Sequence, residues 1–258
     1  MRSLLLRSIE SNLFSYLMEF RSKDAVICNG IDEKWIYSGT PLFNNVVHAN
    51  FRDQIDFRIH SIKDRFENWK VPVTWFVSSL SMPVNLSDYL IKHSFRFDAA
   101  LSAMVLDLND VSWMVESHLD LTVKEINDYK SLNIWTGLLS EGYEITKDKR
   151  DLFRTLFIDM GVSNCSPWNH FIAYLKNRPV ATCTMYNHLG TIGIYWVSTV
   201  PSERRQGIAS SLIMYLLKLI AVSGYRFVVI QANGQGKRCY EKIGFREIGL
   251  INTFKSVL

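Results

Sequence analysis

The sequence predicts a mixed α/β protein in two parts, of which the second has the clearer pattern. Between residues 119 and 258, strand-like and helical runs follow in the order β-α-α-β-β-β-α-β-α-β. The run Phe227–Ile230 is apolar and rich in β-branched residues, and turn residues bound it, as in a strand buried on both faces. A long apolar helix is expected directly before it, over Ile208–Val222. These observations favour an α+β fold built on a mixed sheet.

The first half, residues 1–118, also mixes helices and strands. Apolar residues recur at helical spacing from Leu5 to Phe20, which predicts a helix near residues 3–22. The further elements expected are strands near 25–28, 34–37 and 44–49 (the last with alternating character), a helix from about 51 to 69, a strand at 71–77, a helix at 87–94 and a strand at 99–108. No phosphate loop, catalytic triad or metal motif appears before residue 119.

In the second half, the strands and helices are separated by clear turn signals. Lys176–Pro179 is a turn-like connection typical of a hairpin, and Gly244 ends the last short helix. The expected elements are a strand at 121–126, helices near 130–141 and 147–160, strands at 171–175, 180–185 and 190–197, a helix at 208–222, a strand at 227–230, a helix at about 235–243 and a final strand.

The composition argues against several classes of protein. No stretch approaches the roughly 18 apolar residues that a membrane span needs, and the N-terminal apolar run is too short for a signal peptide. The sequence therefore predicts a cytoplasmic protein with no membrane association. Four cysteines form no CxxC pair and have no histidine at ligand spacing, so no disulfide, metal or iron–sulfur cluster is expected.

The net charge of +4 is unevenly distributed between the two halves. Residues 1–118 hold 12 lysines and arginines against 14 acids, and residues 119–258 hold 17 against 11. The positive second half suits a phosphate-bearing ligand, although a mildly basic surface explains the charge equally well. Basic runs do not exceed two residues and are not interleaved with aromatics, so nucleic-acid binding is not expected.

The segment from Val197 to Ala209 has the composition of an anion site. A strand is expected to end near Val197–Thr199, a polar loop follows, and a helix begins directly after Gly207. N–H groups at a helix N-terminus, reinforced by the helix dipole, attract anions. Gly207 lets a phosphate approach the backbone, and Arg204 and Arg205 add positive charge. Taken alone, the segment is equally consistent with a plain strand–turn–helix connection.

A second segment follows the last buried strand. Asn233 stands at the end of that strand, and Tyr240 comes seven residues later in a short helix. The two segments together resemble the GNAT superfamily of CoA-dependent N-acetyltransferases, whose signatures match Arg204-Arg205-Gln206-Gly207-Ile208-Ala209 and Asn233…Tyr240-Glu241-Lys242-Ile243-Gly244-Phe245. The resemblance covers about 140 residues, just over half of the chain.

This resemblance implies an acetyl-CoA-dependent enzyme that needs no metal. It implies that N–H groups of the loop bind the CoA pyrophosphate, while the end of the preceding strand hydrogen-bonds the pantetheine arm and polarises the thioester carbonyl. Tyr240 would protonate the departing thiolate, since a thiol has a pKa of roughly 8.5 and needs only modest help. The implied cofactor-binding residues are Val197, Ser198, Thr199, Arg204, Arg205, Gln206, Gly207, Ile208, Ala209, Asn233 and Gly236.

Two assignments stay open at this point. The alternative for Tyr240 is a half-buried aromatic that anchors its helix. Many members of the family carry a carboxylate on or near the strand before the phosphate loop, but Ile192–Trp196 contains none. The candidate bases that remain are His170, Asp159, His188 and Tyr195, and otherwise the amine loses its proton to water.

The first half resembles the N-terminal region of tandem GNAT proteins. The similarity lies in Pro41–Val46, a helix, Val73–Val77 and then Leu90–Phe95. In those proteins, this half is a truncated, cofactor-free version of the same fold. The resemblance implies a degenerate GNAT-like domain at 1–118 and a catalytic GNAT domain at 119–258. The alternative for residues 1–118 is an unrelated accessory α/β domain.

The function favoured by these features is transfer of an acetyl group to the primary amine of a small molecule by direct attack. The alternatives are a CoA-binding regulatory or scaffold protein without turnover, and a protein or peptide acetyltransferase. We expect a monomer or a homodimer. The sequence does not identify the acceptor, because acceptor pockets in this fold are built from variable loops.

Overall fold

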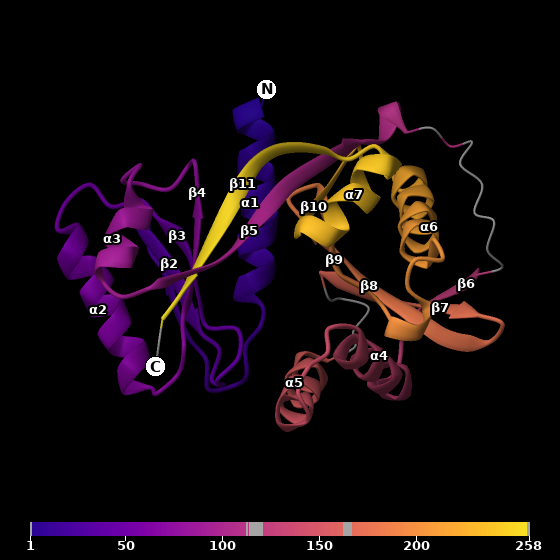
Figure 1. Cartoon of the computed structure of the whole chain (residues 1–258), viewed down its shortest axis with the longest axis horizontal. Helices are drawn as coiled ribbons and strands as arrows, with labels where there is room; N and C mark the ends of the chain where they lie inside the picture. The colour runs from indigo at the N-terminus through magenta and orange to yellow at the C-terminus, as the bar shows by residue number, and fades with distance from the viewer. Residues whose placement is uncertain (1, 112, 114–120, 162–166, 257–258) are drawn as a thin grey trace. The chain divides into compact units, whose positions relative to one another are not determined.

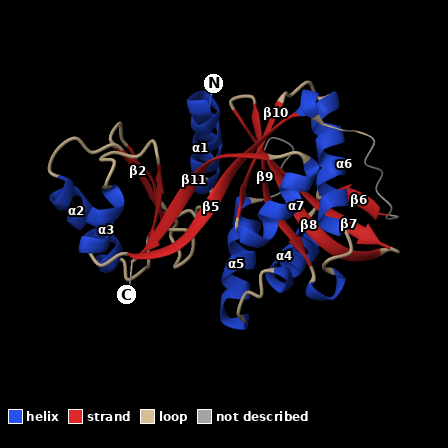
Figure 2. Cartoon of the chain, turned by 45° about the horizontal axis from the view of Figure 1, so that its top comes forward, coloured by secondary structure: helices blue, strands red, loops and turns tan. Residues whose placement is uncertain are grey.

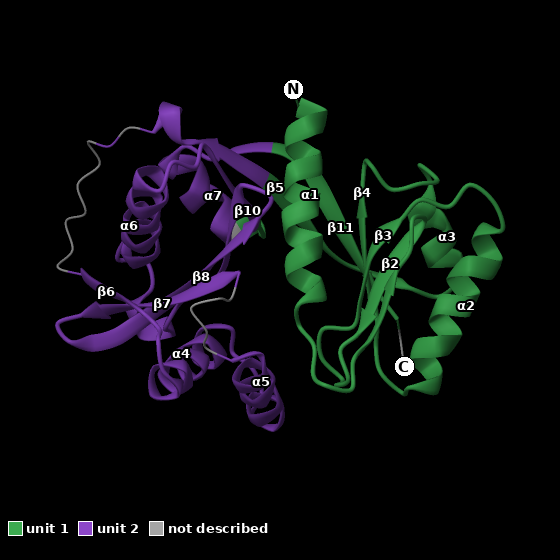
Figure 3. Ribbon diagram, turned by 180° about the vertical axis from the view of Figure 1, so that it is seen from behind, with its two compact units in different colours: residues 1–103, 232–234, 248–258 green, residues 104–231, 235–247 purple. Residues whose placement is uncertain are grey.

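The computed structural model describes residues 2–111, 113, 121–161 and 167–256, and the chain divides into two compact units (Figure 3). The N-terminal unit consists of residues 1–103, 232–234 and 248–258, and the C-terminal unit of residues 104–231 and 235–247. The end of the chain therefore returns to the N-terminal unit. The boundary expected between residues 118 and 119 lies outside the described residues, and the assignment of domains to 1–118 and 119–258 stays a prediction.

The N-terminal unit contains one parallel pair of strands among antiparallel ones. Its elements are α1 (Arg2–Met18), β1 (Val26–Asn29), β2 (Glu33–Tyr37), β3 (Asn45–Ala49), α2 (Ile55–Asn68), β4 (Thr74–Ser78), α3 (Leu86–Lys92), the first part of β5 (Arg96–Asp107) and the last part of β11 (Arg246–Lys255). The strand order is β1-β2-β3-β4-β11-β5, and β11 runs beside β5 (Figure 2). β3 and β4 are parallel, and α2 connects them.

Strand β3 is buried along almost its whole length. The alternation expected at residues 44–49 is therefore wrong, since only His48 of this strand is even partly exposed. The reason is its position: β3 lies between β2 and β4, and Val46 belongs to the same core cluster as Ile59 and Phe66 of α2. A strand that is covered on both faces has no solvent side on which polar residues could alternate.

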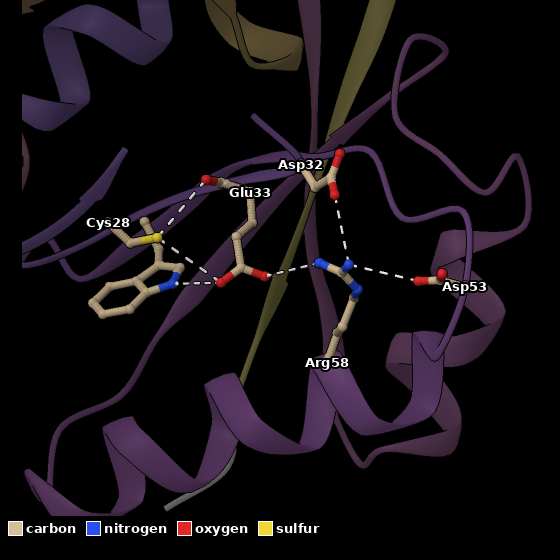
Figure 4. Close-up of polar contacts among 6 residues, drawn as sticks. Cys28, Asp32, Glu33, Asp53 and Arg58 are labelled. Carbon is tan, nitrogen blue, oxygen red and sulfur yellow. Dashed lines mark hydrogen bonds and ion pairs between the residues drawn. The ribbon is translucent and has the colours of Figure 1, made fainter. Parts of the chain in front are cut away.

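Arg58 of α2 joins three carboxylates near the start of its helix (Figure 4). Its guanidinium lies 3.5 Å from Asp32 and 3.6 Å from Asp53. Glu33 of β2 lies 3.9 Å away, and its other carboxylate oxygen accepts a hydrogen bond from the Trp35 indole at 3.2 Å. Because these groups are partly exposed, each ion pair contributes on the order of 1 kcal/mol or less. The charge of Arg58 is balanced by carboxylates of its own unit.

The C-terminal unit combines an antiparallel meander with a second parallel pair (Figure 1). Its elements are the end of β5, the 3-10 turn η1 (Leu108–Asp110), β6 (Leu121–Glu125), α4 (Tyr129–Gly142), α5 (Lys147–Met160), β7 (Trp168–Leu175), β8 (Arg178–His188), β9 (Thr191–Thr199), the 3-10 turn η2 (Pro201–Glu203), α6 (Ile208–Val222), β10 (Phe227–Ala232), α7 (Gly234–Ile243) and the start of β11. The strand order is β5-β10-β9-β8-β7-β6. The meander consists of β6 to β9, while β9 and β10 are parallel and α6 connects them.

Helices cover both sides of strands β7 to β9. Figures 1 and 3 place α6 on one side of these strands and α4 with α5 on the other. The side chains of Leu212, Leu216 and Ile220 of α6 are buried, and so is Val228–Ile230 of β10, as predicted. Burial of each such apolar side chain contributes roughly 1.5–3 kcal/mol. The mixed α/β fold predicted from the sequence is confirmed.

The strands of the meander are longer than the sequence pattern suggests. β7 begins at Trp168 rather than at residue 171, and β8 continues to His188 rather than ending at residue 185. Polar residues in these extensions, such as Asn169 and Asn187, are exposed and interrupt the apolar pattern without ending the ladder. Among the described residues, the helices lack the length and apolar character needed to cross a membrane.

Candidate functional site

Strands β9 and β10 are paired over only part of their length. Residues Ile192–Ile194 of β9 pair in parallel with residues Val228–Ile230 of β10. Further along β9, Ser198 and Thr199 have their register partners on β8. The edge of β9 that faces away from β8 can therefore offer main-chain N–H and C=O groups to an extended ligand over Val197–Thr199.

A β-bulge lies in β9 just before this open edge. Cys183 of β8 faces two residues of β9, Trp196 and Val197. Trp196 has a φ of 51°, a conformation that costs about 1–3 kcal/mol for a bulky residue. Its carbonyl accepts a hydrogen bond from the Thr182 hydroxyl at 3.0 Å. A bulge redirects the main-chain groups beside it. The sequence has no glycine here and gave no sign of the bulge.

The loop after β9 ends in a glycine that caps α6. Gly207 has a φ of 83° and no side chain to bond the first turn, so the first N–H groups of α6 have no partner within the helix. Without a Cβ, this position lets an anion reach those N–H groups and gain from the helix dipole. Arg205 also has a positive φ, of 64°, which turns the chain sharply before the helix. The helix begins directly after Gly207, as predicted.

The side chain of Arg204 binds groups of its own unit. Its Nε donates to the carbonyl of Thr199 at 3.2 Å, and its Nη2 donates to the carbonyl of Gly142 at the end of α4. Its Nη1 lies 3.4 Å from Glu144. The positive charge that was predicted to attract a phosphate is therefore partly balanced by the carboxylate of Glu144. The cofactor contact predicted for Arg204 stays a prediction, and it concerns the main chain.

The end of α4 packs directly against the open part of β9. A Cβ added at Gly142 would lie 3.2 Å from the Cβ of Ser198 and 3.3 Å from the carbonyl oxygen of Thr199, so a larger residue here would push α4 and β9 apart. The next residue, Tyr143, packs edge-on against Trp196 with ring centroids 5.6 Å apart. Its hydroxyl donates to the carbonyl of Val197 at 3.4 Å. Sequence reasoning missed Tyr143, because Gly142-Tyr143 looks like an ordinary helix end.

Tyr240 of α7 has its ring enclosed and its hydroxyl inside the unit. The residue is 8% exposed. Gly236 lies one turn earlier, and a Cβ there would come within 3.2 Å of the Tyr240 ring and 3.5 Å of its hydroxyl oxygen. Glycine at this position therefore leaves room for the phenol. The ring also packs against Phe245, with centroids 6.0 Å apart.

Burial raises the pKa values of both Tyr240 and Tyr143. Burial raises the pKa of Tyr240 well above its usual value, and the neighbouring Tyr143 raises this pKa further. Although Tyr143 is 48% exposed as a whole residue, its hydroxyl is directed to β9, and burial raises its pKa to about 12. Both phenols therefore keep their protons at neutral pH and can act as hydrogen-bond or proton donors.

The other predicted residues occupy the same loop and the elements on either side of it. Ser198 and Ile208 are buried, Ala209 is partly buried, and Arg205 and Gln206 are exposed. Gln206 donates to Glu203 at 3.1 Å. Asn233 is exposed in the turn between β10 and α7.

His170 is the candidate base that the structure describes in most detail. It lies in the core between β7 and α4, with its ring 4.4 Å from the Trp135 ring, and its Nδ1 is 2.7 Å from the Thr184 hydroxyl. Burial lowers its pKa to about 3, so the ring is neutral at neutral pH and a weak base. Burial raises the pKa of Tyr195 well above its usual value, so this phenol is also protonated. Asp159 is exposed on α5.

Among the described residues, no group of three or more histidine, cysteine, aspartate or glutamate side chains is placed to hold a metal ion. The described cysteines Cys28, Cys183 and Cys239 carry free thiols. The fourth, Cys165, lies outside the described residues.

The partly paired parallel strands β9 and β10, the bulge in β9 and the glycine-capped loop before α6 are typical of the GNAT fold. Solved structures with this fold align with almost the whole chain. A GCN5-related N-acetyltransferase from Kribbella flavida is 13% identical with a TM-score of 0.73, covering 96% of this chain and 94% of that one. A functionally unknown conserved protein from Staphylococcus epidermidis is 13% identical with a TM-score of 0.69, covering 90% and 94%. A tandem GNAT protein from the clavulanic acid biosynthesis pathway is 12% identical with a TM-score of 0.63, covering 92% and 84%.

The sequence itself carries the family signature in the C-terminal unit. Residues 166–247 match the family model described as an acetyltransferase (GNAT) domain. A comparison with curated protein sequences finds no match. The C-terminal unit therefore contains an acetyltransferase (GNAT) domain, and the chain has the fold of the solved GNAT structures.

Proposed function

We propose that the protein is an acetyl-CoA-dependent N-acetyltransferase that acts on the primary amine of a small molecule by direct attack. The observation that carries this proposal is the open edge of β9, with the glycine-capped loop at one end and, at the other, the bulge that Tyr143 contacts. Tyr240 is buried in the same unit and keeps its proton at neutral pH. An anion site at one end and proton donors at the other suit a substrate with a pyrophosphate at one end and a thioester at the other.

In this proposal, Val197–Thr199 bind the pantetheine arm as an added strand would bind. N–H groups of the loop Arg204–Ala209 hold the pyrophosphate, and Asn233 and Gly236 make further contacts with the arm. The fit is supported by the positive φ of Gly207, which leaves the helix N-terminus accessible to a phosphate. It is also supported by the carbonyl of Val197, which accepts a weak hydrogen bond of 3.4 Å from the Tyr143 hydroxyl.

Acetyl-CoA would supply the acetyl thioester, and the protein would supply polarisation and a proton. N–H groups at the Trp196–Val197 bulge polarise the thioester carbonyl. Tyr240 donates its hydroxyl proton to the departing sulfur. Since β9 carries no carboxylate, the attacking nitrogen loses its proton to water, and the Tyr240 phenolate regains a proton from water.

The N-terminal half acts in this proposal as a degenerate GNAT-like scaffold. The succession β3-α2-β4 corresponds to β9-α6-β10 in order and in parallel pairing. The corresponding helix α2 begins after Gln54 rather than after a glycine. The Arg58 side chain in its first turns already pairs with Asp32, Glu33 and Asp53, so its charge is balanced within the unit.

The test is a screen of amine acceptors that follows release of the CoA thiol, combined with Tyr240→Phe. This substitution removes one hydroxyl and keeps the packed ring. We expect CoA binding to be nearly unchanged and turnover to fall by roughly 10²–10⁴-fold. The control is Tyr215→Phe, at a half-exposed tyrosine of α6, which should keep full activity.

Three outcomes would contradict parts of the proposal. Full turnover of Tyr240→Phe would remove this residue from the mechanism. CoA binding without transfer to any acceptor would favour a regulatory or scaffold protein. Transfer to peptides but not to small amines would favour a peptide acetyltransferase.

A further inference from the structure

The side chain of Arg204 joins the loop Arg204–Ala209 to the end of α4. Its Nε donates to the carbonyl of Thr199 at 3.2 Å, in the strand that precedes the loop. Its Nη2 donates to the carbonyl of Gly142, the last residue of α4, and its Nη1 lies 3.4 Å from the Glu144 carboxylate. We call Arg204, Gly142 and Glu144 the α4 clamp. One guanidinium thus holds two segments that are about sixty residues apart in the sequence.

The carbonyl of Gly142 needs a donor from outside its helix. The last four carbonyl groups of an α-helix have no partner within it, and the negative end of the helix dipole lies there. A guanidinium suits this position because it carries a positive charge and several N–H donors in one plane. The ion pair with Glu144 is weak on its own, since the two side chains are 40% and 73% exposed. The hydrogen bonds from the charged Arg204 to two carbonyls add to it.

Glu144 has a backbone conformation that favours glycine, with a φ of 53°. The N–H groups of Glu144 and Ile145 donate back to carbonyls in the last turn of α4, in the pattern of a Schellman motif. Glycine is the usual residue at this position, and α6 and α7 of the same unit are followed by Gly224 and Gly244, both with positive φ. A glutamate here adds backbone strain, and it places a carboxylate 3.4 Å from Arg204.

The α4 clamp also fixes the segment beside the bulge of β9. Gly142 packs against Ser198 of the open edge. The ring of Tyr143 packs edge-on against Trp196 of the bulge. The main chain of Arg204 belongs to the loop whose N–H groups are proposed to hold the CoA pyrophosphate. A ligand that fixes this main chain leaves less entropy to be lost when the Arg204 side chain forms its contacts.

We propose that Arg204 is a positioning residue that couples CoA binding to the order of the α4 end. The inference rests on the proposed function, in which the pyrophosphate binds the loop after β9 and the acetyl group lies at the bulge. CoA bound to the loop strengthens the clamp, and the clamp holds Gly142–Ile145 beside the acetyl group, where the acceptor amine arrives. By linkage, a clamp that CoA strengthens must itself increase the affinity for CoA.

The first experiment measures amide hydrogen exchange with and without CoA. In the wild type, we expect CoA to slow the exchange of the Glu144 and Ile145 amides by about 5-fold or more. In Arg204→Gln and Glu144→Gln, which should both still bind CoA, this slowing should be lost. The amide of Val71 is the internal control, because Lys70 has a φ of 56° and ends α2 in the same motif in the N-terminal unit.

A double-mutant cycle of the CoA dissociation constant separates the clamp from a direct contact between Arg204 and a phosphate. We expect Arg204→Gln and Glu144→Gln each to raise the dissociation constant, by about 2–5-fold for an exposed ion pair. The double variant should bind CoA as Arg204→Gln does, because the two residues act together. If Arg204 instead left Glu144 to bind a phosphate, Glu144→Gln would lower the dissociation constant. Opposite signs for the two single variants would overturn the inference.

Glu144→Gly tests whether the carboxylate serves stability or coupling. Glycine adopts the positive φ without strain, so we expect the Tm to stay the same or to rise. The CoA dissociation constant should still rise, because the carboxylate is lost. Lys70→Gly relieves the same strain at the end of α2 and is the matched control, which should keep the wild-type affinity. Wild-type affinity in Glu144→Gly, at any Tm, would show that the carboxylate does not act on CoA binding and would refute the coupling.

The outcomes separate this inference from the proposed function. A wild type that binds CoA with unchanged exchange at Glu144 and Ile145 overturns the inference and leaves the cofactor site standing. A wild type that binds no CoA overturns both.

Discussion

Gly142 and Gly137 of α4 provide a matched pair for measuring how tightly this helix packs on β9. An alanine at either position gains about 0.5–1 kcal/mol, because alanine loses less backbone entropy in a helix. At Gly137, a Cβ would meet nothing within 4 Å. Gly137→Ala should therefore stabilise the protein by about 0.5–1 kcal/mol.

At Gly142, the same substitution meets β9. The added Cβ would overlap the hydroxyl of Ser198, which lies 1.8 Å away and can rotate aside. It would also lie 3.2 Å from the Ser198 Cβ and 3.3 Å from the Thr199 carbonyl oxygen, which cannot move without the strand. Overpacking of this kind costs about 1–3 kcal/mol. Since the helix gain is common to both variants, we expect Gly142→Ala to be less stable than Gly137→Ala by about 2 kcal/mol.

Thermal unfolding followed by tryptophan fluorescence measures this difference. For a chain of this size, about 2 kcal/mol corresponds to a Tm difference of roughly 4–8 °C. The CoA dissociation constant should rise in Gly142→Ala and not in Gly137→Ala, because the overlap falls on Ser198 and Thr199. Equal Tm values for the two variants would refute the close packing of α4 on β9.

The remaining predictions concern a buried histidine and the anion site. His170 has a pKa of about 3 in the fold against 6.5 in the unfolded chain, so the unfolded state binds the proton first, and stability is lost as pH falls below about 6.5. At about pH 5 the free energy of unfolding should be lower by about 2 kcal/mol than at about pH 7, as measured by urea unfolding. This loss should be smaller in His170→Gln and unchanged in the exposed His60→Gln. Equal losses in the wild type and in His170→Gln would contradict the burial of His170. Gly207→Val should abolish CoA binding, as measured by calorimetry. Gly224→Val, at the other end of α6 and with a similar φ of 82°, is the control and should still bind CoA. A Gly207→Val variant that binds CoA normally would place the phosphate site elsewhere.

The features that the sequence could predict are those encoded locally. The apolar run Phe227–Ile230 and the helix Ile208–Val222 follow from periodicity, and their burial agrees with it. The helix start after Gly207 follows from a short motif. The motif around Tyr240 likewise identified a residue that proves to be buried, with its pKa raised by that burial.

The features that the sequence could not predict depend on residues far apart in the chain. The bulge at Trp196 needs a partner strand, and its positive φ is held by packing and not by residue type. Arg204 finds Glu144 about sixty residues away, which no charge pattern along the chain reveals. The burial of His170, and with it the low pKa, comes from aromatic side chains of α4 and α5.

The sequence by itself determined the order of the helices and strands, the loop that begins α6, and the GNAT resemblance of the C-terminal unit. Only the tertiary structure decided that the Tyr143 hydroxyl reaches the carbonyl of Val197, and that residues 248–255 belong to the N-terminal unit. The physical reason is the range of the interactions. Backbone propensity and periodic burial act between residues a few positions apart, whereas packing and electrostatics join whatever the folded chain brings together.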